Sequence, residues 1–108
     1  MKNFKKELRF VYITCGSIEE AKRIGKILVK DNLVACVNIL RDMISIFRWE
    51  EKIVEASEVV MIAKTRKSLM PQLIETISKN HSYDCPCILE LPIQGGKSEF
   101  LKWIESET

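Results

Sequence analysis

The stretch that decides the fold is residues 33–64, LVACVNILRDMISIFRWEEKIVEASEVVMIAK. It contains three runs rich in β-branched and aromatic residues, VACVNIL, ISIFRW and EVVMIAK, and a charged segment, EEKIVEAS. Such runs are typical of strands on a pleated, half-buried surface. The pattern therefore predicts three β segments here, with residues 50–57 as the connector before the third.

The ISIFRW run has apolar side chains on both of its faces. In an extended strand Ile44 and Ile46 share one face, whereas Phe47 and Trp49 share the other. A strand with aromatic side chains opposite its aliphatic ones is expected to be covered on both sides. Because 108 residues supply one core but little material for a second layer, we expect a second copy of the chain to provide the cover.

The residues before this stretch predict a strand and a helix. LRFVYITC, residues 8–15, is apolar on both faces, as in a central strand. Ser17 is expected to cap the helix that follows, with Glu20 completing a capping box. Gly25 lies inside this helix, where glycine costs about 1 kcal/mol relative to alanine. We expect it there because the helix packs closely against a strand.

The residues after the stretch complete one domain, residues 1–108. Ser68 is expected to cap a second helix with Pro71 in its first turn, CILELPI (87–93) predicts the last strand, and Ser98 is expected to cap a short final helix. The order is β-α-β-β-α-β with an additional β segment and a C-terminal helix. This α+β order is that of ferredoxin-like domains.

Composition excludes several classes of function. The 17 basic and 15 acidic residues give a formal net charge of +2, which is too balanced for a nucleic-acid footprint or a membrane surface. No window approaches the roughly 20 apolar residues of a membrane-spanning helix, and MKNFKKELRF is not followed by the apolar stretch of a signal peptide. The sequence predicts a cytoplasmic protein with no nucleic-acid partner.

Motifs for catalysis are missing from the sequence. It has no G-x-S-x-G, Walker loop or H-E-x-x-H, and it lacks the aromatic motif by which related sheets stack RNA bases. Acylphosphatases share the topology but need an arginine in the loop after the first strand, where residues 15–18 read CGSI. With no visible nucleophile–base pair, we expect binding rather than catalysis.

The four cysteines are expected to be reduced, because nothing in the sequence indicates secretion. Cys15 and Cys36 read as small buried residues in strands. Cys85 and Cys87 flank Pro86, and residues i and i+2 of a strand project to the same face. Two thiols on one face suit a soft ion, Cu(I) before Zn²⁺, because sulfur is polarizable.

A third candidate ligand for such an ion is His81, four residues before Cys85, and Cys36 is the fourth candidate metal ligand. By spacing alone, however, His81 reads as a surface-loop residue, and Lys64 as an exposed strand end. The alternative to a metal site is that Cys85 and Cys87 are unreactive thiols that bind no metal.

Five segments together resemble the CutA family of divalent-cation tolerance proteins: LVACVNIL, SIFRWEEKI, SEVVMIAKT, HSYDCP and FLKWI. The resemblance runs from about Arg9 to Ser106. The combination of A-C-V-N, S-I-[YF]-R-W-E and E-V-x-x-x-x-K-T is highly specific.

The resemblance implies a ferredoxin-like subunit, similar to the nitrogen-regulatory PII proteins, that assembles into a tight homotrimer around its long central strands. It implies a role in tolerance of copper and other divalent metals. It places a binding cleft between subunits at Cys36, Trp49, Glu50, Lys64, His81 and Tyr83. The alternative function is a PII-like module that binds a small metabolite or a partner protein.

Three residues depart from the family pattern. Glu51 stands where the family usually has a glycine after Trp-Glu, so the turn there must accept a side chain. Ser82 replaces the proline of His-Pro-Tyr, and Cys87 replaces a glutamate. The last change puts in doubt any role that needs a carboxylate at that position and supplies a second thiol.

Overall fold

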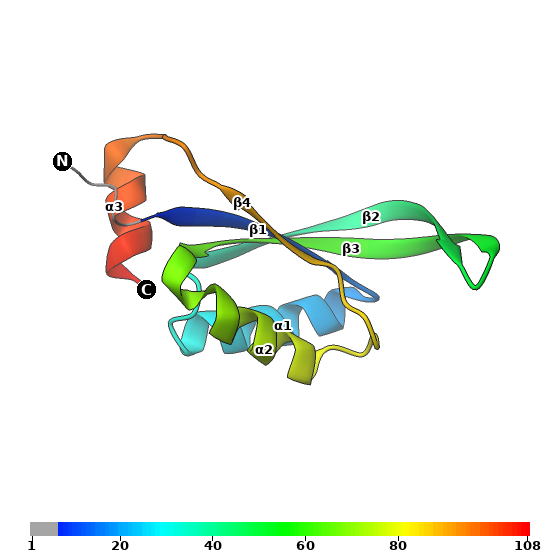
Figure 1. Cartoon of the computed structure of the whole chain (residues 1–108). Helices are drawn as coiled ribbons and strands as arrows, with labels where there is room; N and C mark the ends of the chain where they lie inside the picture. Colours follow the sequence, from blue (N-terminus) through cyan, green and yellow to red (C-terminus); the bar gives the residue numbers. More distant parts are fainter. Residues whose placement is uncertain (1–6) are drawn as a thin grey trace.

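Four antiparallel strands and three helices make up residues 7–108, the part of the chain that the computed structural model describes. The elements are β1 (Leu8–Cys15), α1 (Ile18–Lys30), β2 (Cys36–Trp49), β3 (Lys52–Arg66), a 3₁₀ turn (Lys67–Leu69), α2 (Met70–Asn80), β4 (Ile88–Pro92) and α3 (Ser98–Ser106). The sheet order is β2-β3-β1-β4 (Figure 1). This is the predicted βαββαβ order with a C-terminal helix.

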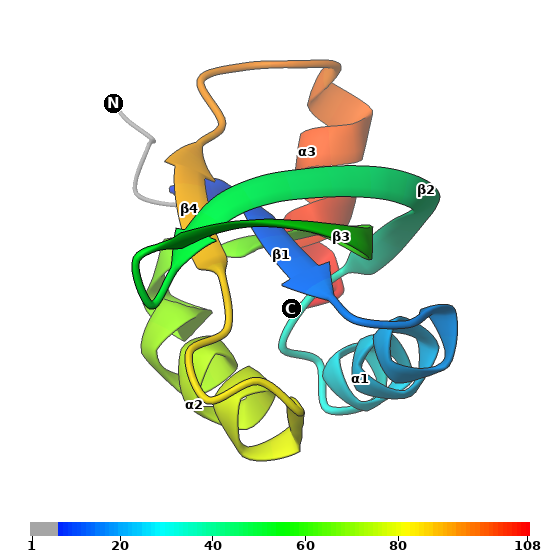
Figure 2. The same ribbon diagram turned by 90° about the vertical axis from the view of Figure 1, so that its right-hand side faces the viewer.

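The core lies between one face of the sheet and the helices α1 and α2, which lie side by side (Figure 2). β1 contributes Val11, Ile13 and Cys15, and its alternate residues point to the other face. Gly25 of α1 faces β2, and a Cβ atom there would lie 3.4 Å from a methyl carbon of Val37. The predicted close packing of this glycine is confirmed.

The predicted boundaries within residues 33–64 were wrong. VACVNIL and ISIFRW belong to one strand, β2, whose register against β3 shifts between Leu40 and Met43. Asp42 has φ 66° within this shift, as expected of a β-bulge. Most of the expected connector is also strand, because β3 begins at Lys52. The charged side chains of this segment point into solvent from a strand. Their charge was therefore not a sign of a loop.

The β2–β3 hairpin projects well beyond the helices (Figure 1), and the structure measures 50 × 25 × 23 Å. The projecting part exposes apolar side chains on both faces. Ile46 is 68% exposed and Ile53 73% exposed, while Trp49, on the opposite face from Ile46, is 55% exposed. Within one chain, neither face of the hairpin tip is covered.

The helix starts agree with the sequence only in part. Ser17 caps α1 as predicted, accepting a hydrogen bond from the Glu20 amide at 3.1 Å. The predicted capping box was wrong, because the Glu20 carboxylate accepts from the amides of Gly16 and Ser82 instead. Pro71 lies in the first turn of α2, but Ser68 does not cap this helix because it lies inside the 3₁₀ turn. Ser98 is the first residue of α3 and its hydroxyl bonds Glu99 instead. Among residues 7–108, no helix is long and apolar enough to cross a membrane.

The backbone conformation of the hairpin turn Glu50–Glu51 leads us to predict a stabilising substitution. Both residues have positive φ, 50° and 68°, a conformation for which a two-residue hairpin prefers Asn-Gly. Glu51→Gly should raise the free energy of unfolding by about 1 kcal/mol, because positive φ costs a non-glycine residue roughly 1–2 kcal/mol and the freer unfolded chain offsets part of this. Denaturant unfolding at fixed protein concentration measures the change.

Glu55→Gly is the matched control, since Glu55 lies in the same hairpin with extended backbone. This variant should lose about 0.5–1 kcal/mol, the ordinary cost of glycine within a strand. Stability changes of the same sign in both variants would contradict a strained turn.

We predict that Glu20 contributes to the stability of the fold and that this contribution is lost in acid. Its carboxylate is 8% exposed and accepts hydrogen bonds from the backbone amides of Gly16 at 3.2 Å and Ser82 at 2.6 Å. Burial favours a higher pKa for Glu20, but the bonds from Ser82 and Gly16 outweigh it, so the pKa is lowered. Glu20→Gln has one acceptor oxygen for these donors and should cost about 1–3 kcal/mol at pH 7.

Because the folded-state pKa of Glu20 is depressed, its contribution is present above the unfolded pKa of about 4.3 and is lost as pH falls through the folded value. The difference between wild type and Glu20→Gln should therefore shrink in denaturant unfolding at pH 3. Exposed Glu19, the neighbour of Glu20, provides the control: Glu19→Gln should leave stability nearly unchanged at both pH values. A pH-independent difference for Glu20→Gln would refute this role of the charge.

Candidate functional site

A cavity of about 610 Å³ opens on the sheet face away from α1 and α2. Strands β1, β2 and β3 and the segment before β4 form its walls. Its lining residues are Tyr12, Thr14, Ser45, Phe47, Trp49, Val54, Ala56, Glu58, Tyr83, Asp84, Cys85 and Cys87. Four residues predicted from the sequence are therefore brought together: Trp49, Tyr83, Cys85 and Cys87.

Glu58 was missed by the sequence analysis, although it lines the same cavity. The Tyr83 hydroxyl donates a hydrogen bond of 2.7 Å to its carboxylate. Burial, this bond and the charge of Glu58 raise the pKa of Tyr83 far above its usual value. The phenol therefore remains protonated and keeps donating to Glu58 across the physiological pH range. An acidic residue at the start of the apolar run EVVMIAK was the available signal.

His81 does not line the cavity but is hydrogen-bonded to Tyr83, which does. Its Nε2 lies 2.7 Å from the Thr14 carbonyl oxygen, and its Nδ1 lies 3.1 Å from the Tyr83 amide nitrogen. A carbonyl only accepts and an amide N–H only donates, so Nε2 donates to Thr14 and Nδ1 accepts from Tyr83. His81 Nδ1 also lies 3.8 Å from a carboxylate oxygen of Glu20. The His81 side chain is 0% exposed. The expectation of a surface-loop histidine was therefore wrong.

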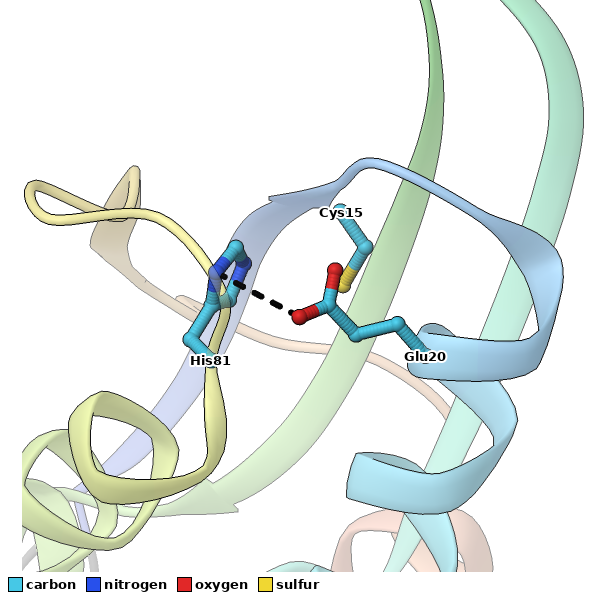
Figure 3. A group of neighbouring side chains, drawn as sticks. All are labelled: Cys15, Glu20 and His81. Carbon is cyan, nitrogen blue, oxygen red and sulfur yellow. Dashed lines mark ion pairs between the residues drawn. The ribbon is translucent and has the colours of Figure 1, made fainter.

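His81 also belongs to a buried cluster with Cys15 and Glu20 (Figure 3), whose potential ligand atoms lie within 4.8 Å of one another. Each group already has a role without a metal. The Glu20 carboxylate binds two backbone amides, and both ring nitrogens of His81 are engaged. Burial raises the pKa of Cys15 to about 11, so it is a thiol at neutral pH. The cluster anchors the loop after α2.

Cys85 and Cys87 precede β4, which begins at Ile88. The argument that strand alternation places both thiols on one face therefore does not apply, yet both line the cavity. Cys85 is exposed and Cys87 is half-buried. Burial, followed by the charge of Glu58, raises the pKa of Cys87. Both cysteines are therefore accessible to a ligand in the cavity.

The remaining predicted residues lie elsewhere in the chain. Cys36 pairs with Lys64 across β2 and β3, and the Lys64 ammonium donates to the side-chain oxygen of Asn38. Thr14 at the cavity pairs with Val60, so Lys64 lies roughly 13 Å further along β3 at the usual strand rise. Glu50 lies at the tip of the hairpin. Within one chain, the residues predicted to form the cleft therefore lie in three separate places.

Comparison with known proteins agrees with this fold over nearly the whole chain. The family model described as CutA1 divalent ion tolerance protein matches residues 9–107. The divalent-cation tolerance protein CutA of Archaeoglobus fulgidus is 47% identical over 96 residues, which are 89% of this chain and 93% of that protein. The chloroplastic protein CutA of Arabidopsis thaliana is 40% identical over 98 residues, 91% of this chain and 54% of that protein.

The solved structures agree as well. The crystal structure of CutA1 from Oryza sativa has a TM-score of 0.93 at 37% identity, covering 95% of this chain and 94% of that one. At this identity the likeness extends beyond the fold. The chain belongs to the CutA1 divalent ion tolerance protein family.

Proposed function

We propose that this chain forms a homotrimer that binds copper at the thiols beside its open cavity and acts by binding rather than by catalysis. The assembly is supported by the exposed apolar residues on both faces of the β2–β3 hairpin. β2 and β4 are also the edges of the sheet, with backbone groups free to pair with another chain. A three-membered closed ring satisfies such edges, and the family resemblance supports that number.

The copper site is supported by the accessible thiols of Cys85 and Cys87 on one cavity wall. Thiolates are the ligands that Cu(I) prefers. His81 is not included, because recruiting it would break its bonds to Thr14 and Tyr83. Cys36 lies away from this wall, and we leave it out of the site. Bound copper would be held by the two sulfurs, and the protein's contribution is to present them together.

The assembly predicts a mass of three times the 12.5 kDa subunit in light scattering after size exclusion. Ile46→Lys should dissociate the trimer, because it places a charge on an apolar hairpin face that a partner would bury. Ile74→Lys is the matched control: Ile74 is 40% exposed on α2, away from the hairpin. A wild-type monomer at micromolar concentration would contradict the assembly, and a trimeric Ile46→Lys variant would remove the hairpin from it.

The copper site predicts that the double variant Cys85→Ser, Cys87→Ser loses one Cu(I) equivalent per chain in an anaerobic competition with a chromogenic Cu(I) chelator. Cys36→Ser should keep the wild-type stoichiometry, because Cys36 lies outside the cavity. Ligation displaces the thiol protons, so wild-type affinity should be higher at pH 8 than at pH 6. The raised pKa of Cys87 makes this dependence persist above neutral pH. Unchanged stoichiometry in the double variant would refute the site.

A further inference from the structure

The charged side chains that line the cavity are all acidic. Four aromatic side chains line it, Tyr12, Phe47, Trp49 and Tyr83, together with the carboxylates of Glu58 and Asp84. Neither lysine nor arginine is among the described residues that line it. A wall of aromatic rings and carboxylates attracts cations, because both the ring faces and the carboxylates are negative.

Glu58 is a carboxylate of the cavity lining whose charge is not paired with a basic side chain of residues 7–108. Its carboxylate is half-buried and receives one hydrogen bond, from the Tyr83 hydroxyl. Its charge acts on three neighbours, raising the pKa of Cys15, Tyr83 and Cys87. A carboxylate can accept about four hydrogen bonds, so Glu58 keeps acceptor sites for a ligand.

The Tyr83 end of the cavity is held in place before any ligand arrives. The Tyr83 ring lies against the His81 ring, with centroids 4.7 Å apart, and its amide is bonded to His81. His81 is fixed in turn to the Thr14 carbonyl of β1. Tyr83 therefore presents its hydroxyl to Glu58 without having to be ordered on binding, which lowers the entropic cost of binding.

We propose that this cavity binds a small organic ammonium ion that carries an apolar group, with the ammonium at Glu58 and the apolar part between Phe47 and Trp49. A hard metal cation fits less well, because Mg²⁺ and Ca²⁺ are coordinated by oxygen atoms, whereas four of the lining residues are aromatic and two are aliphatic. The volume of about 610 Å³ lies within the range of small-molecule sites, roughly 300–1,000 Å³.

This proposal goes beyond copper binding and needs neither thiol. It also uses residues of one chain only, although Phe47 and Trp49 lie on the hairpin that we assign to the subunit contact. In a trimer the mouth of the cavity would therefore lie beside the subunit boundary. Light scattering on the same samples keeps the outcome for the ligand separate from the outcome for the assembly.

The test compares 2-phenylethylamine, which is protonated at pH 7, with its uncharged analogue 2-phenylethanol, both with a metal chelator present. Trp103 of α3 is replaced by phenylalanine, so that fluorescence reports Trp49 alone. The amine should change this fluorescence saturably and bind at least about tenfold more tightly than the alcohol, the ratio expected when a carboxylate and ring faces meet a desolvated cation.

Glu58→Gln should weaken binding of the amine about tenfold and leave the alcohol unchanged. Glu55→Gln is the matched control: Glu55 lies on the same strand but projects to the opposite face, and it should keep the affinity of the parent protein. Trp49→Leu, measured by calorimetry on samples whose mass is checked by light scattering, provides a second variant and should weaken the amine at least about threefold.

Equal affinity for the amine and the alcohol would overturn the proposal, as would unchanged amine binding in Glu58→Gln. Should that variant fail to fold, unchanged binding in Trp49→Leu would overturn it. No amine binding by a protein that scatters as a trimer would show that the partner fills the cavity, which also refutes the proposal. No binding by a monomer would refute it together with the assembly.

Discussion

The Glu20 carboxylate is the contact on which the site depends. It bonds the amide of Gly16, where β1 ends, and the amide of Ser82, in the loop that leads to β4. These segments are far apart in sequence, and the carboxylate joins them from the first turn of α1. His81 and Tyr83 flank Ser82, so fixing this amide sets the ring of one against the Thr14 carbonyl and the hydroxyl of the other against Glu58. The polar wall of the cavity thus depends on an acidic residue in the first turn of α1.

A second constraint acts at the tip of the β2–β3 hairpin. β2 and β3 are long enough to extend past the helices, so the same strands serve the core at one end and expose apolar side chains at the other. The two-residue turn that joins them places both glutamates at positive φ. A tip held in this conformation keeps the strands in register, which a subunit contact formed by them would require. The turn has no glycine, so its positive φ angles destabilise the hairpin tip. This segment has few core contacts of its own.

Local patterns in the sequence predicted the elements well, because strand and helix periodicity are properties of neighbouring residues. Ser17, Gly25 and Pro71 lie as their residue types indicate. The errors arose where pairing between distant segments decides the outcome. β2 continues through its bulge because β3 pairs with both of its halves, and His81 is buried because β1 supplies a carbonyl that it can bond. Neither partner could be identified from residues near the one in question.

Glu58 links the two sites that we propose. Its charge is one of the causes that raise the pKa of Cys87, and it is also the anchor for an ammonium ion. An ammonium ion at this carboxylate would offset its charge and make the thiolate form of Cys87 easier to reach. Since Cu(I) binds the thiolate, occupancy of the cavity by a cation would lower the cost of ligation by Cys87. Direct repulsion between the two cations acts against this effect. By linkage, copper changes the affinity for the amine by the same factor that the amine changes the affinity for copper.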